Sequence, residues 1–452
     1  MTLVLDEPVL EELRSELRGP VIGPADPGYE TARKVHNGMD KRPAVIACCA
    51  GVADVMAALE FGLAHDLPIA VRGGGHNVAG KAVCDDGIVI DLSGMKGIRV
   101  DPAKRVARAE AGLTWGEFER DAGVRARDDR GRDLDHRHRG SHPRRRHRLS
   151  PAEVRARVRQ PGLGRCRHSR RAAPDRERSP EPRPSWGLRG GGGNFGIVTS
   201  FEYRLHPIGQ VLAGPVVHPF SAAHEAFAFY RDYSRTAPDD VAALFALTAL
   251  PDGQWAVTLF VCYSDPAEES EGAIAPVHEF GSPLEDLIEP MSYREVQMSF
   301  DADFPPGMQN YWKSSNMDEL SDDAIDTMVA FMESSPSFQP MVFLERFGGA
   351  VARVPAEATA FGHRDAAYDL VIASIWSEEH EQEAHIDWAK SFWEAMQPYS
   401  TESVYVNYLS EEGEDRVRAA YGGEPYARLV EMKRRYDPEN VFRNNQNINP
   451  DG

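Results

Sequence analysis

PIAVRGGGHNVAG, residues 68–80, is the stretch that decides how this chain folds. Pro68 to Val71 form a short apolar run of the kind found in buried strands, and three glycines follow before His76 and Asn77. Glycine has no Cβ, so such a turn can adopt left-handed backbone angles and let a ligand approach its N–H groups closely. We therefore expect a strand that ends in an open turn with a histidine at its end.

The sequence around this turn alternates between patterns typical of strands and patterns typical of helices. Apolar runs predict strands, and apolar residues at helical spacing predict helices. Strands are expected at AVIACC (44–49), GIVIDLS (87–93) and KRVARAEAG (104–112), and helices at VADVMAALEFGLAHD (52–66) and LTWGEFERDAG (113–123). This alternation indicates an α+β domain.

Three further motifs accompany the turn: GIVIDLSGMKGIRVDPAKRVARAEAG (87–112), RGGGGNFGIVTSFEYRLHP (189–207) and KRRYDPENVFRNNQNI (433–448). Together with residues 68–80 they resemble the berberine-bridge-enzyme-like, FAD-linked oxidases of the vanillyl-alcohol-oxidase superfamily. The resemblance covers most of residues 30–123 and 186–452. It implies a two-part, PCMH-type FAD-binding domain and an antiparallel-sheet substrate domain backed by helices.

The resemblance also implies a covalent flavin. In this family the histidine matching His76 carries FAD through the 8α carbon of the isoalloxazine ring, and a neutral imidazole is a competent nucleophile for that bond. The alternative is a hydrogen-bonded turn histidine. The cofactor contacts implied in this region are Arg72, Gly73, Gly74, Gly75, His76, Asn77, Gly80, Asp91 and Ser93.

A second glycine turn, before a predicted strand, is expected to lie beside the flavin's pyrophosphate and ribityl chain. Its residues are Gly192, Gly193, Asn194, Gly196, Ile197 and Val198. A helix over residues 425–436 is expected to end before Pro438, because proline disfavours helical angles at the preceding residue. The amide-rich tail that follows resembles the family's C-terminal element, which braces the cofactor, and it adds Asn445 and Asn447 to the expected contacts.

Between residues 208 and 401, strand-like and helical runs alternate and predict the substrate domain. Its aromatic residues can line a pocket, although core packing is the better expectation for each one. They are Tyr311, Trp312, Phe343, Phe347, Tyr368 and Trp376. The sequence leaves open whether His363 and Arg364 face the site, and the default expectation for Lys313 is a solvated face.

The best catalytic candidates lie in SVYVNYLS, residues 403–410. On a strand, side chains alternate, so Tyr405 and Asn407 are expected on one face and Tyr408 on the other. The family carries a similar motif beside the flavin, where a tyrosine helps to remove the substrate's hydroxyl proton. A phenol with a pKa of about 10 needs a neighbouring cation or hydrogen-bond donor to serve as a base. We expect Tyr408 to be the base and Tyr405 with Asn407 to be pocket or flavin contacts; a paired aromatic strand is the alternative.

The predicted domains are residues 1–207 for FAD, 208–401 for the substrate and 402–452 for the C-terminal element. Inside the first lies an anomaly. Between Arg125 and Arg183 there are 20 arginines, no lysine and 8 acidic residues, or about +12 in a chain whose net charge is −19. Such a segment has too few apolar residues to order a strand or a helix.

A frame slip explains this segment. Read one base out of register with GC-rich codons, DLDHRHRGSHPRRRHR (133–148) can become ISTTGIAGLTLGGGIG, a glycine-rich text of the kind this family carries there. We hypothesise two compensating slips, near Val124 and Ser185, in the gene or in its sequencing. The alternative is a genuine insert that acts as an electrostatic arm for an anionic partner. The re-read text offers no second cysteinyl flavin link.

Composition sets the remaining expectations. Five cysteines (Cys48, Cys49, Cys84, Cys166 and Cys262) show neither metal-ligand spacing nor a disulfide framework. The acidic balance argues against nucleic acid, and no apolar run is long enough to span a membrane. The acidic N-terminus lacks the pattern of a signal peptide, so a cytoplasmic location is expected. We expect an oxidoreductase that moves a hydride from an alcohol- or amine-bearing carbon to FAD, with dioxygen as acceptor. A catalytically impaired remnant of this fold and a binding protein with a basic arm are the competing interpretations.

Overall fold

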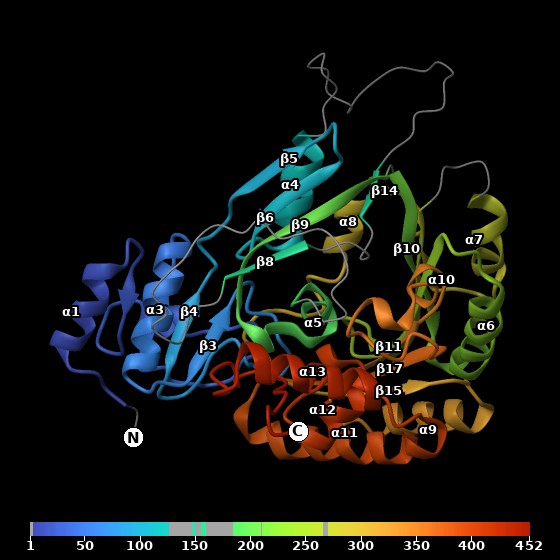
Figure 1. Cartoon of the computed structure of the whole chain (residues 1–452). Coiled ribbons are helices and arrows are strands. Elements are labelled where there is room, and N and C mark those ends of the chain that lie inside the picture. The colour runs from blue at the N-terminus through green and yellow to red at the C-terminus, as the bar shows by residue number, and fades with distance from the viewer. Residues whose placement is uncertain (1–2, 126–146, 150–154, 160–183, 209, 265–269) are drawn as a thin grey trace.

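The chain folds into helices and three β-sheets (Figure 1), in a computed structural model that describes residues 3–125, 147–149, 155–159, 184–208, 210–264 and 270–452. A four-stranded and a five-stranded sheet hold the N-terminal part, and an eight-stranded antiparallel sheet holds most of the rest. The predicted α+β class is confirmed.

The first sheet has the strand order β1-β2-β4-β3. Its central strand β4 (Ile88–Asp91) runs parallel to β2 (Val45–Cys48) and to β3 (Ile69–Arg72) and is buried along its whole length. Side chains alternate along a strand, so Ile88 and Ile90 pack into the cluster under α1 and α3, while Val89 packs on the other face. Parallel strands end at the same edge, and the turn after β3 therefore starts beside Asp91. The smaller elements are α1 (Glu7–Glu16), β1 (Val21–Ile22), α2 (Tyr29–Ala32) and α3 (Val52–Ala64).

The second sheet is built on the long strand β9 (Ile197–Ile208). β9 pairs with β6 (Val106–Glu110), whose other neighbour is β5 (Ile98–Asp101), and helix α4 (Trp115–Arg125) packs beside them. β9 also pairs with β7 (His147–Leu149) and β8 (Arg155–Arg159), which lie inside the Arg-rich segment.

The expectation that the Arg-rich segment forms no strand is therefore wrong at β7 and β8. The physical reason is that β9 offers both stretches a row of backbone N–H and C=O groups, and pairing of this kind does not depend on apolar side chains. Residues 126–146, 150–154 and 160–183 lie outside the described residues. The frame slip and the electrostatic arm both remain predictions.

The eight-stranded sheet has the order β13-β10-β12-β11-β16-β17-β15, with β14 also beside β10. Residues of four helices form one large core cluster with one face of this sheet, and Figure 1 shows these helices along its outer side. The helices are α6 (Ala223–Thr236), α7 (Ser270–Glu279), α9 (Asp322–Glu333) and α11 (Gln382–Met396). The other face is left for the rest of the molecule. Its strands are β10 (Gln210–Pro219), β11 (Val241–Ala249), β12 (Trp255–Tyr263), β13 (Glu285–Asp286), β14 (Glu289–Ser292), β15 (Gln309–Met317), β16 (Met341–Arg346) and β17 (Tyr368–Trp376).

Side-chain caps mark where some of these helices begin. Ser321 accepts a hydrogen bond from the Ala324 N–H at the start of α9, and Ser292 with Glu295 forms a capping box at α8. Among the described residues, no helix is both long enough and apolar enough to cross a bilayer. The helices here are η2 (Phe220–Ala222), α6 (Ala223–Thr236), α7 (Ser270–Glu279), α8 (Tyr293–Met298), α9 (Asp322–Glu333), α10 (Gly349–Ala352), η3 (Ala356–Ala358), η4 (Glu379–Glu381), α11 (Gln382–Met396) and η5 (Gln397–Tyr399).

Two strand predictions need correction. The strand-like run over residues 340–354 ends at Arg346, because Gly349 has a φ of +53° and starts the short helix α10. The run over residues 403–410 is not a strand either: its centre is the 3₁₀ turn η6 (Val406–Tyr408). Both changes move side chains that matter for the site.

The C-terminal element returns to the N-terminal part of the molecule. Helices α12 (Glu414–Tyr421) and α13 (Gly423–Tyr436), red in Figure 1, pack against α5 (Pro184–Gly191) and η1 (Gly192–Phe195). The predicted end of the last helix before Asp437 is confirmed. The tail after it thereby reaches the second glycine turn.

Candidate active site

The first glycine turn is held open by its backbone. Gly75 has a φ of +74°, in the left-handed region, and its carbonyl accepts a hydrogen bond of 3.1 Å from the His36 N–H. A Cβ on Gly73 would lie 2.8 Å from the Ala111 carbonyl oxygen, so a larger residue would push the turn away from its neighbour. Gly80 also has a positive φ, +62°, and closes the segment that begins at His76.

His76 is exposed, and its ring stacks on that of His36 with centroids 4.5 Å apart. Burial and the neighbouring His76 both lower the pKa of His36. His36 is therefore neutral at neutral pH and places no positive charge beside the His76 ring. His36 was not among the residues predicted from the sequence.

The charged groups of Arg72 and Asp91 are already bound to protein. Arg72 Nη2 lies 2.6 Å from Asp91 Oδ2, and Arg72 Nη1 donates to the Ala32 carbonyl at 2.6 Å. Asp91 Oδ1 accepts from the Ser93 N–H at 2.9 Å. Arg72 and Asp91 thus brace the turn from the sheet side. The buried pair uses its charged atoms within the protein, and the cofactor contacts expected for Arg72 and Asp91 stay a prediction.

The second glycine turn faces open space. A Cβ on Gly192 or Gly193 would meet nothing within 4 Å, and Gly192 has a φ of +59°. Asn194 is buried and holds the C-terminal tail: its Nδ2 donates to the Gln446 carbonyl at 3.0 Å and its Oδ1 accepts from the Ile448 N–H at 2.9 Å. Gly196 precedes β9, whose Ile197 side chain points into the N-terminal core while Val198 pairs with β8.

Lys433 ties the tail to this turn. Its ammonium group is fully buried and donates to the carbonyl oxygens of Asn194 and Phe442, each at 2.9 Å, and to Asp437 Oδ2 at 2.7 Å. Further along, Asn445 Oδ1 and Asn447 Oδ1 are buried and have no hydrogen-bond partner among the residues that the structure describes. Buried polar atoms are normally hydrogen-bonded, so these two amide oxygens indicate a missing donor.

The structure brings Tyr405 and Tyr408 together, contrary to the prediction. Residues three apart in a helical turn share a face, and the two rings meet edge to face with centroids 5.1 Å apart. Asn407 is exposed, and its Nδ2 lies 2.6 Å from the Tyr405 hydroxyl. The alternation expected of a strand is wrong here because residues 406–408 form a turn.

The partner of Tyr408 is a carboxyl group, and not the cation or hydrogen-bond donor that was expected. The Tyr408 hydroxyl lies 3.0 Å from Glu345 Oε1 on β16, and burial together with this acidic neighbour raises the pKa of Tyr408. Burial also raises the pKa of Glu345. Glu345 lies opposite Asp369 in the register of β16 and β17, and Asp369 accepts a 2.6 Å hydrogen bond from the Ser314 hydroxyl. Burial raises the pKa of Asp369 as well.

Aromatic rings surround the two tyrosines. Trp312 and Phe343 lie 5.6 and 6.1 Å from Tyr408, and Phe361 lies 5.5 Å from Tyr405, all measured between ring centroids. Phe347 packs at the Tyr405 edge. Of the aromatic residues considered from the sequence, Trp312, Phe343 and Phe347 thus face the site.

The other candidates lie elsewhere. Tyr368 hydrogen-bonds Ser234 in the core, Tyr311 packs against the same core, and Trp376 stacks on His385. His363 Nε2 is bound to the Ala419 carbonyl, and Arg364 donates to Thr359 and lies over the Phe361 ring. Lys313 is not on a solvated face: its side chain is 9% exposed and pairs with Glu412.

The glycine turn and the tyrosine pair belong to one site. Val78, two residues after His76, packs against the cluster that contains Trp312, Phe343 and Tyr408. Asn37 joins the two sides, since its Nδ2 donates to the carbonyls of Val78 (2.7 Å) and Asn310 (3.3 Å). Lys81 reaches Glu411 with an ion pair of 2.7 Å.

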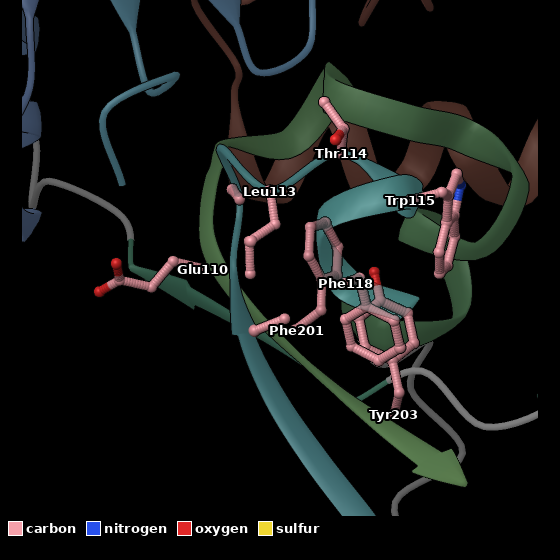
Figure 2. Close-up of a pocket in the computed structure, with 9 residues that line it drawn as sticks. Glu110, Leu113, Thr114, Trp115, Phe118, Phe201 and Tyr203 are labelled. Atoms are coloured by element: carbon pink, nitrogen blue, oxygen red, sulfur yellow. The ribbon is translucent and has the colours of Figure 1, made fainter. Parts of the chain in front are cut away.

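A separate small cavity of about 50 Å³ lies on the second sheet (Figure 2). Glu110, Thr114 and four aromatic side chains line it, with Phe118 and Tyr203 edge to face and Trp115 at the rim. None of the predicted site residues lines this cavity. It belongs to the packing of α4 on β6 and β9.

Comparisons with known proteins match two stretches of the chain that contain parts of this candidate site. A family described as "FAD binding domain" matches residues 43–127, which include the His76 turn, and one described as "Berberine and berberine like" matches residues 404–449. The (R)-6-hydroxynicotine oxidase of Paenarthrobacter nicotinovorans is 28% identical over 471 residues, covering 96% of this chain and 98% of that protein. An FAD-linked oxidoreductase of Dictyostelium discoideum is 25% identical, with 90% and 89% covered.

The chain therefore carries an FAD-binding domain and a berberine-like C-terminal domain, and the relatives and solved structures it is similar to are FAD-linked oxidoreductases. Its fold matches the crystal structure of 6-hydroxy-D-nicotine oxidase from Arthrobacter nicotinovorans, with a TM-score of 0.77, 25% identity and coverage of 99% of this chain and 100% of that one. A berberine bridge enzyme variant has the same fold, with a TM-score of 0.75 and 17% identity over 97% and 98% of the two chains.

The residues of this oxidoreductase fit an FAD. The second glycine turn leaves room for a ligand against its backbone, and within the part of the chain that the structure describes the buried amide oxygens of Asn445, Asn447 and Asn37 have no donor. The Trp312 Nε1–H is a buried donor without an acceptor. A cofactor with ring nitrogens, carbonyls and hydroxyls supplies partners of both kinds.

Sequence reasoning missed His36, Asn37, Glu345 and Asp369. His36 and Asn37 lie in a polar loop with no motif, and only their hydrogen bonds to Gly75, Gly307 and Val78 reveal them. Glu345 offered a weak signal, because a carboxylate inside the apolar run MVFLERF is costly to bury without a role.

Proposed function

We propose that this FAD-linked oxidoreductase oxidises a small amine with an aromatic ring, and that its FAD is bound covalently through His76. The observation that carries the proposal is the half-buried carboxyl of Glu345, hydrogen-bonded to Tyr408 inside a group of aromatic rings. Aromatic faces attract cations, and a carboxyl group can take the proton that an ammonium must lose before it is oxidised.

Tyr408 and Glu345 share the proton transfer in this proposal. The Tyr408 hydroxyl donates to Glu345, so its oxygen lone pairs are free to accept the substrate N–H or O–H. As the substrate proton moves to Tyr408, the phenol proton moves to Glu345, and Tyr408 never has to exist as a free tyrosinate. This removes the need for a lowered phenol pKa. FAD, when bound, accepts the hydride that the neighbouring carbon loses, and dioxygen is the proposed final acceptor.

The other residues hold the partners in place. Tyr405 and Asn407 form the pocket rim, with Asn407 orienting the Tyr405 hydroxyl. Asn37 and the paired His36 and His76 hold the turn against β15, and Arg72 with Asp91 fixes where the turn starts. The aromatic rings exclude water, which strengthens the interactions of the Glu345 carboxylate.

The test is anaerobic reduction of the enzyme-bound flavin, followed as loss of absorbance near 450 nm. (R)-6-hydroxynicotine is the amine probe, because an oxidase named for it is 28% identical across almost the whole chain. Chitobiose is the matched sugar probe, since a chitooligosaccharide oxidase shares the fold at a TM-score of 0.74. We expect the amine to bleach the flavin and the sugar to leave it oxidised.

The carboxyl role is tested with Glu345→Gln, which keeps the shape of the side chain. Loss of general-base assistance costs about 10²- to 10⁴-fold in the rate of flavin reduction. Burial raises the pKa of Glu345, so the rate in the parent should fall as the pH drops through a value above the usual 4.3 for glutamate, and Glu345→Gln should lose this limb. Reduction by chitobiose alone would refute the amine assignment, and an unchanged rate in Glu345→Gln would refute the proton transfer.

A further inference from the structure

Strand β15 is the last strand of its sheet, so among the described residues one side of it has no neighbouring strand. An uncovered edge presents free N–H and C=O groups and invites unwanted pairing. Here alternate residues of that edge are covered by side chains and backbone from outside the sheet. The contacts are Asn37 to the Asn310 carbonyl, Ser410 to Trp312, Arg416 to the Ser314 carbonyl at 3.0 Å, and residues Thr401 and Ser403 to Asn316.

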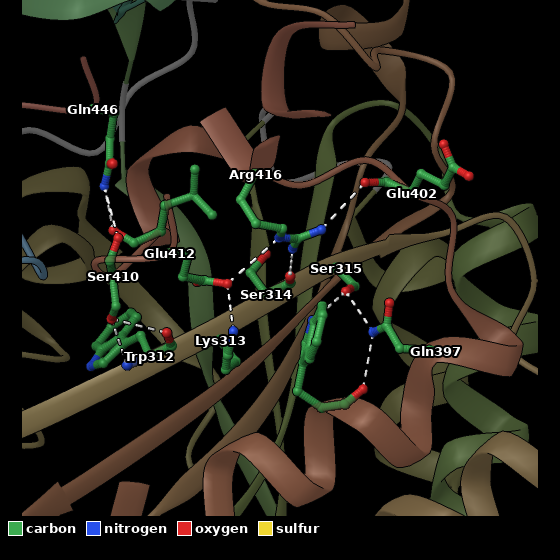
Figure 3. Close-up of polar contacts among 12 residues, drawn as sticks. Trp312, Lys313, Ser314, Ser315, Gln397, Glu402, Ser410, Glu412, Arg416 and Gln446 are labelled. Carbon is green, nitrogen blue, oxygen red and sulfur yellow. Dashed lines mark hydrogen bonds and ion pairs between the residues drawn. The ribbon is translucent and has the colours of Figure 1, made fainter. Parts of the chain in front are cut away.

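Ser410 makes the contact closest to Tyr408. Its hydroxyl accepts from the Trp312 N–H at 3.1 Å and donates to the Trp312 carbonyl at 3.0 Å, so one side chain takes the place of a pairing residue (Figure 3). Ser410 is buried and lies two residues after Tyr408. Gln446 Nε2 donates to the Leu409 carbonyl at 2.6 Å and holds the same stretch from the side of the tail.

The side chain of Glu412, two residues after Ser410, lies on the opposite face of the sheet. Its Oε2 lies 2.5 Å from Lys313 Nζ and 3.5 Å from Arg416 Nε, and the side chains of Glu412 and Lys313 are 4% and 9% exposed. Lys313 and Arg416 both lie over the Trp393 ring, at 4.2 and 5.0 Å from its centroid. An ion pair this deeply buried is held in one arrangement, since either charge left alone would be costly.

The two contacts therefore lie on either side of one strand. Neighbouring residues of β15 point to opposite faces, so Trp312 lies beside Tyr408 while Lys313 lies beside Trp393. The segment from Tyr408 to Glu412 passes around the edge of β15. It is fixed on the face where Tyr408 lies, along the strand edge, and on the face where Trp393 lies. We call Ser410, Glu412 and Lys313 the edge clip.

We propose that the edge clip positions Tyr408 for catalysis by holding its hydroxyl against Glu345. The proposal rests on the function proposed above for the Tyr408 and Glu345 pair. The three residues are positioning residues, because none of them reaches the rings around Tyr405 and Tyr408. Displacing a reacting group by about 1 Å can cost roughly a hundredfold in rate, so a loosened clip should lower the rate of the chemical step while flavin and substrate still bind.

The experiment uses the full-length holoenzyme labelled with 3-fluorotyrosine and observed by ¹⁹F NMR. The Tyr408 resonance is assigned by its loss in Tyr408→Phe, and Glu345→Gln marks its position when the carboxylate partner is gone. Ser410→Ala and Lys313→Met open the clip. Ser410→Thr keeps the hydroxyl, and Ser400→Ala is the matched control, because the Ser400 hydroxyl bonds only the local Met396 carbonyl at 2.9 Å.

We expect the Tyr408 resonance to shift toward the Glu345→Gln position or to broaden in Ser410→Ala and in Lys313→Met. In Ser410→Thr and Ser400→Ala it should coincide with the parent. With the amine probe, Ser410→Ala should slow flavin reduction by roughly a hundredfold, with the half-saturating probe concentration and the flavin content unchanged. Ser410→Thr should recover most of the rate.

An unmoved Tyr408 resonance in both clip variants would overturn the proposal. So would a rate loss that merely follows loss of flavin. Failure of the proposed function looks different: then the amine probe leaves the parent flavin oxidised, while the resonance still reports whether the clip sets the position of Tyr408.

Discussion

Lys433 offers the sharpest test of how the C-terminal tail supports the flavin site. Lys433→Met keeps most of the side-chain volume but removes the ammonium group. Three acceptors lose a hydrogen bond at once, namely the carbonyl oxygens of Asn194 and Phe442 and the Asp437 carboxylate, although Phe442 keeps the one from Asn445 Nδ2 at 3.0 Å. The lysine is fully buried, so water cannot replace the lost hydrogen bonds without opening the structure.

The expected cost follows from these contacts. Removing one partner of a buried ion pair costs about 3–5 kcal/mol, because the remaining charge has no compensation. Asp437 keeps hydrogen bonds from the N–H groups of Val441 and Phe442, each at 2.9 Å, which places the cost toward the lower end of this range. Lys433→Met/Asp437→Asn removes both charges and should recover part of the loss.

Amide hydrogen exchange measures the opening of this region directly. We expect exchange of peptides spanning residues 426–448 to accelerate roughly 10²- to 10³-fold in Lys433→Met, since each 1.36 kcal/mol is a factor of ten. Lys96→Met is the control, because its pair with Glu117 is on the surface and contributes about 0–1 kcal/mol. Equal exchange in the two variants would refute the reasoning.

Two further predictions concern stability. Burial raises the folded-state pKa of Asp369 above the value of about 3.9 for an unfolded chain. The protonated Asp369 side chain therefore contributes to folding stability at low pH, and this contribution is lost as the pH rises through the folded-state pKa. Asp369→Asn should therefore gain stability over the parent between pH 4.5 and pH 8 in urea titrations, and a difference independent of pH would contradict this. In Gly38→Ala, the new Cβ would lie 2.4 Å from the Gly307 carbonyl oxygen, and the loop that carries His36 would have to move away from the segment before β15. We expect Gly38→Ala to lose about 1–3 kcal/mol of unfolding free energy and to retain flavin more weakly. Gly116→Ala is the control, because a Cβ there would meet none of the described atoms within 4 Å, and it should be neutral or slightly stabilising. Equal urea midpoints for the two variants would count against the close contact at Gly38.

Much of the fold could be predicted because its elements carry strong local patterns. The strand into Arg72, the amphipathic α3 and the buried β4 follow directly from apolar periodicity. Strand β15 could not be predicted this way. Its sequence QNYWKSSNM is polar, and its residues are buried because the edge clip and α11 cover them.

The site was predictable where one motif contains the chemistry. The turn at His76 is an example, since glycines and histidine lie together in the sequence. Tyr408 was proposed from its motif, but its partner was not, because Glu345 is 63 residues away and meets it only when β16 and η6 come together. The same is true of Asn194, whose role in holding the tail depends on contacts with Gln446 and Ile448.

The central claim is that FAD is held between the two glycine turns and the tyrosine pair, and is linked covalently to His76. The most direct measurement is ultraviolet-excited flavin fluorescence of the acidified protein band on a denaturing gel, for the parent and for His76→Ala. The account predicts a fluorescent band for the parent and a dark band for His76→Ala. A dark parent band from a yellow native protein would contradict the covalent link, and a colourless native protein would contradict the flavin site itself.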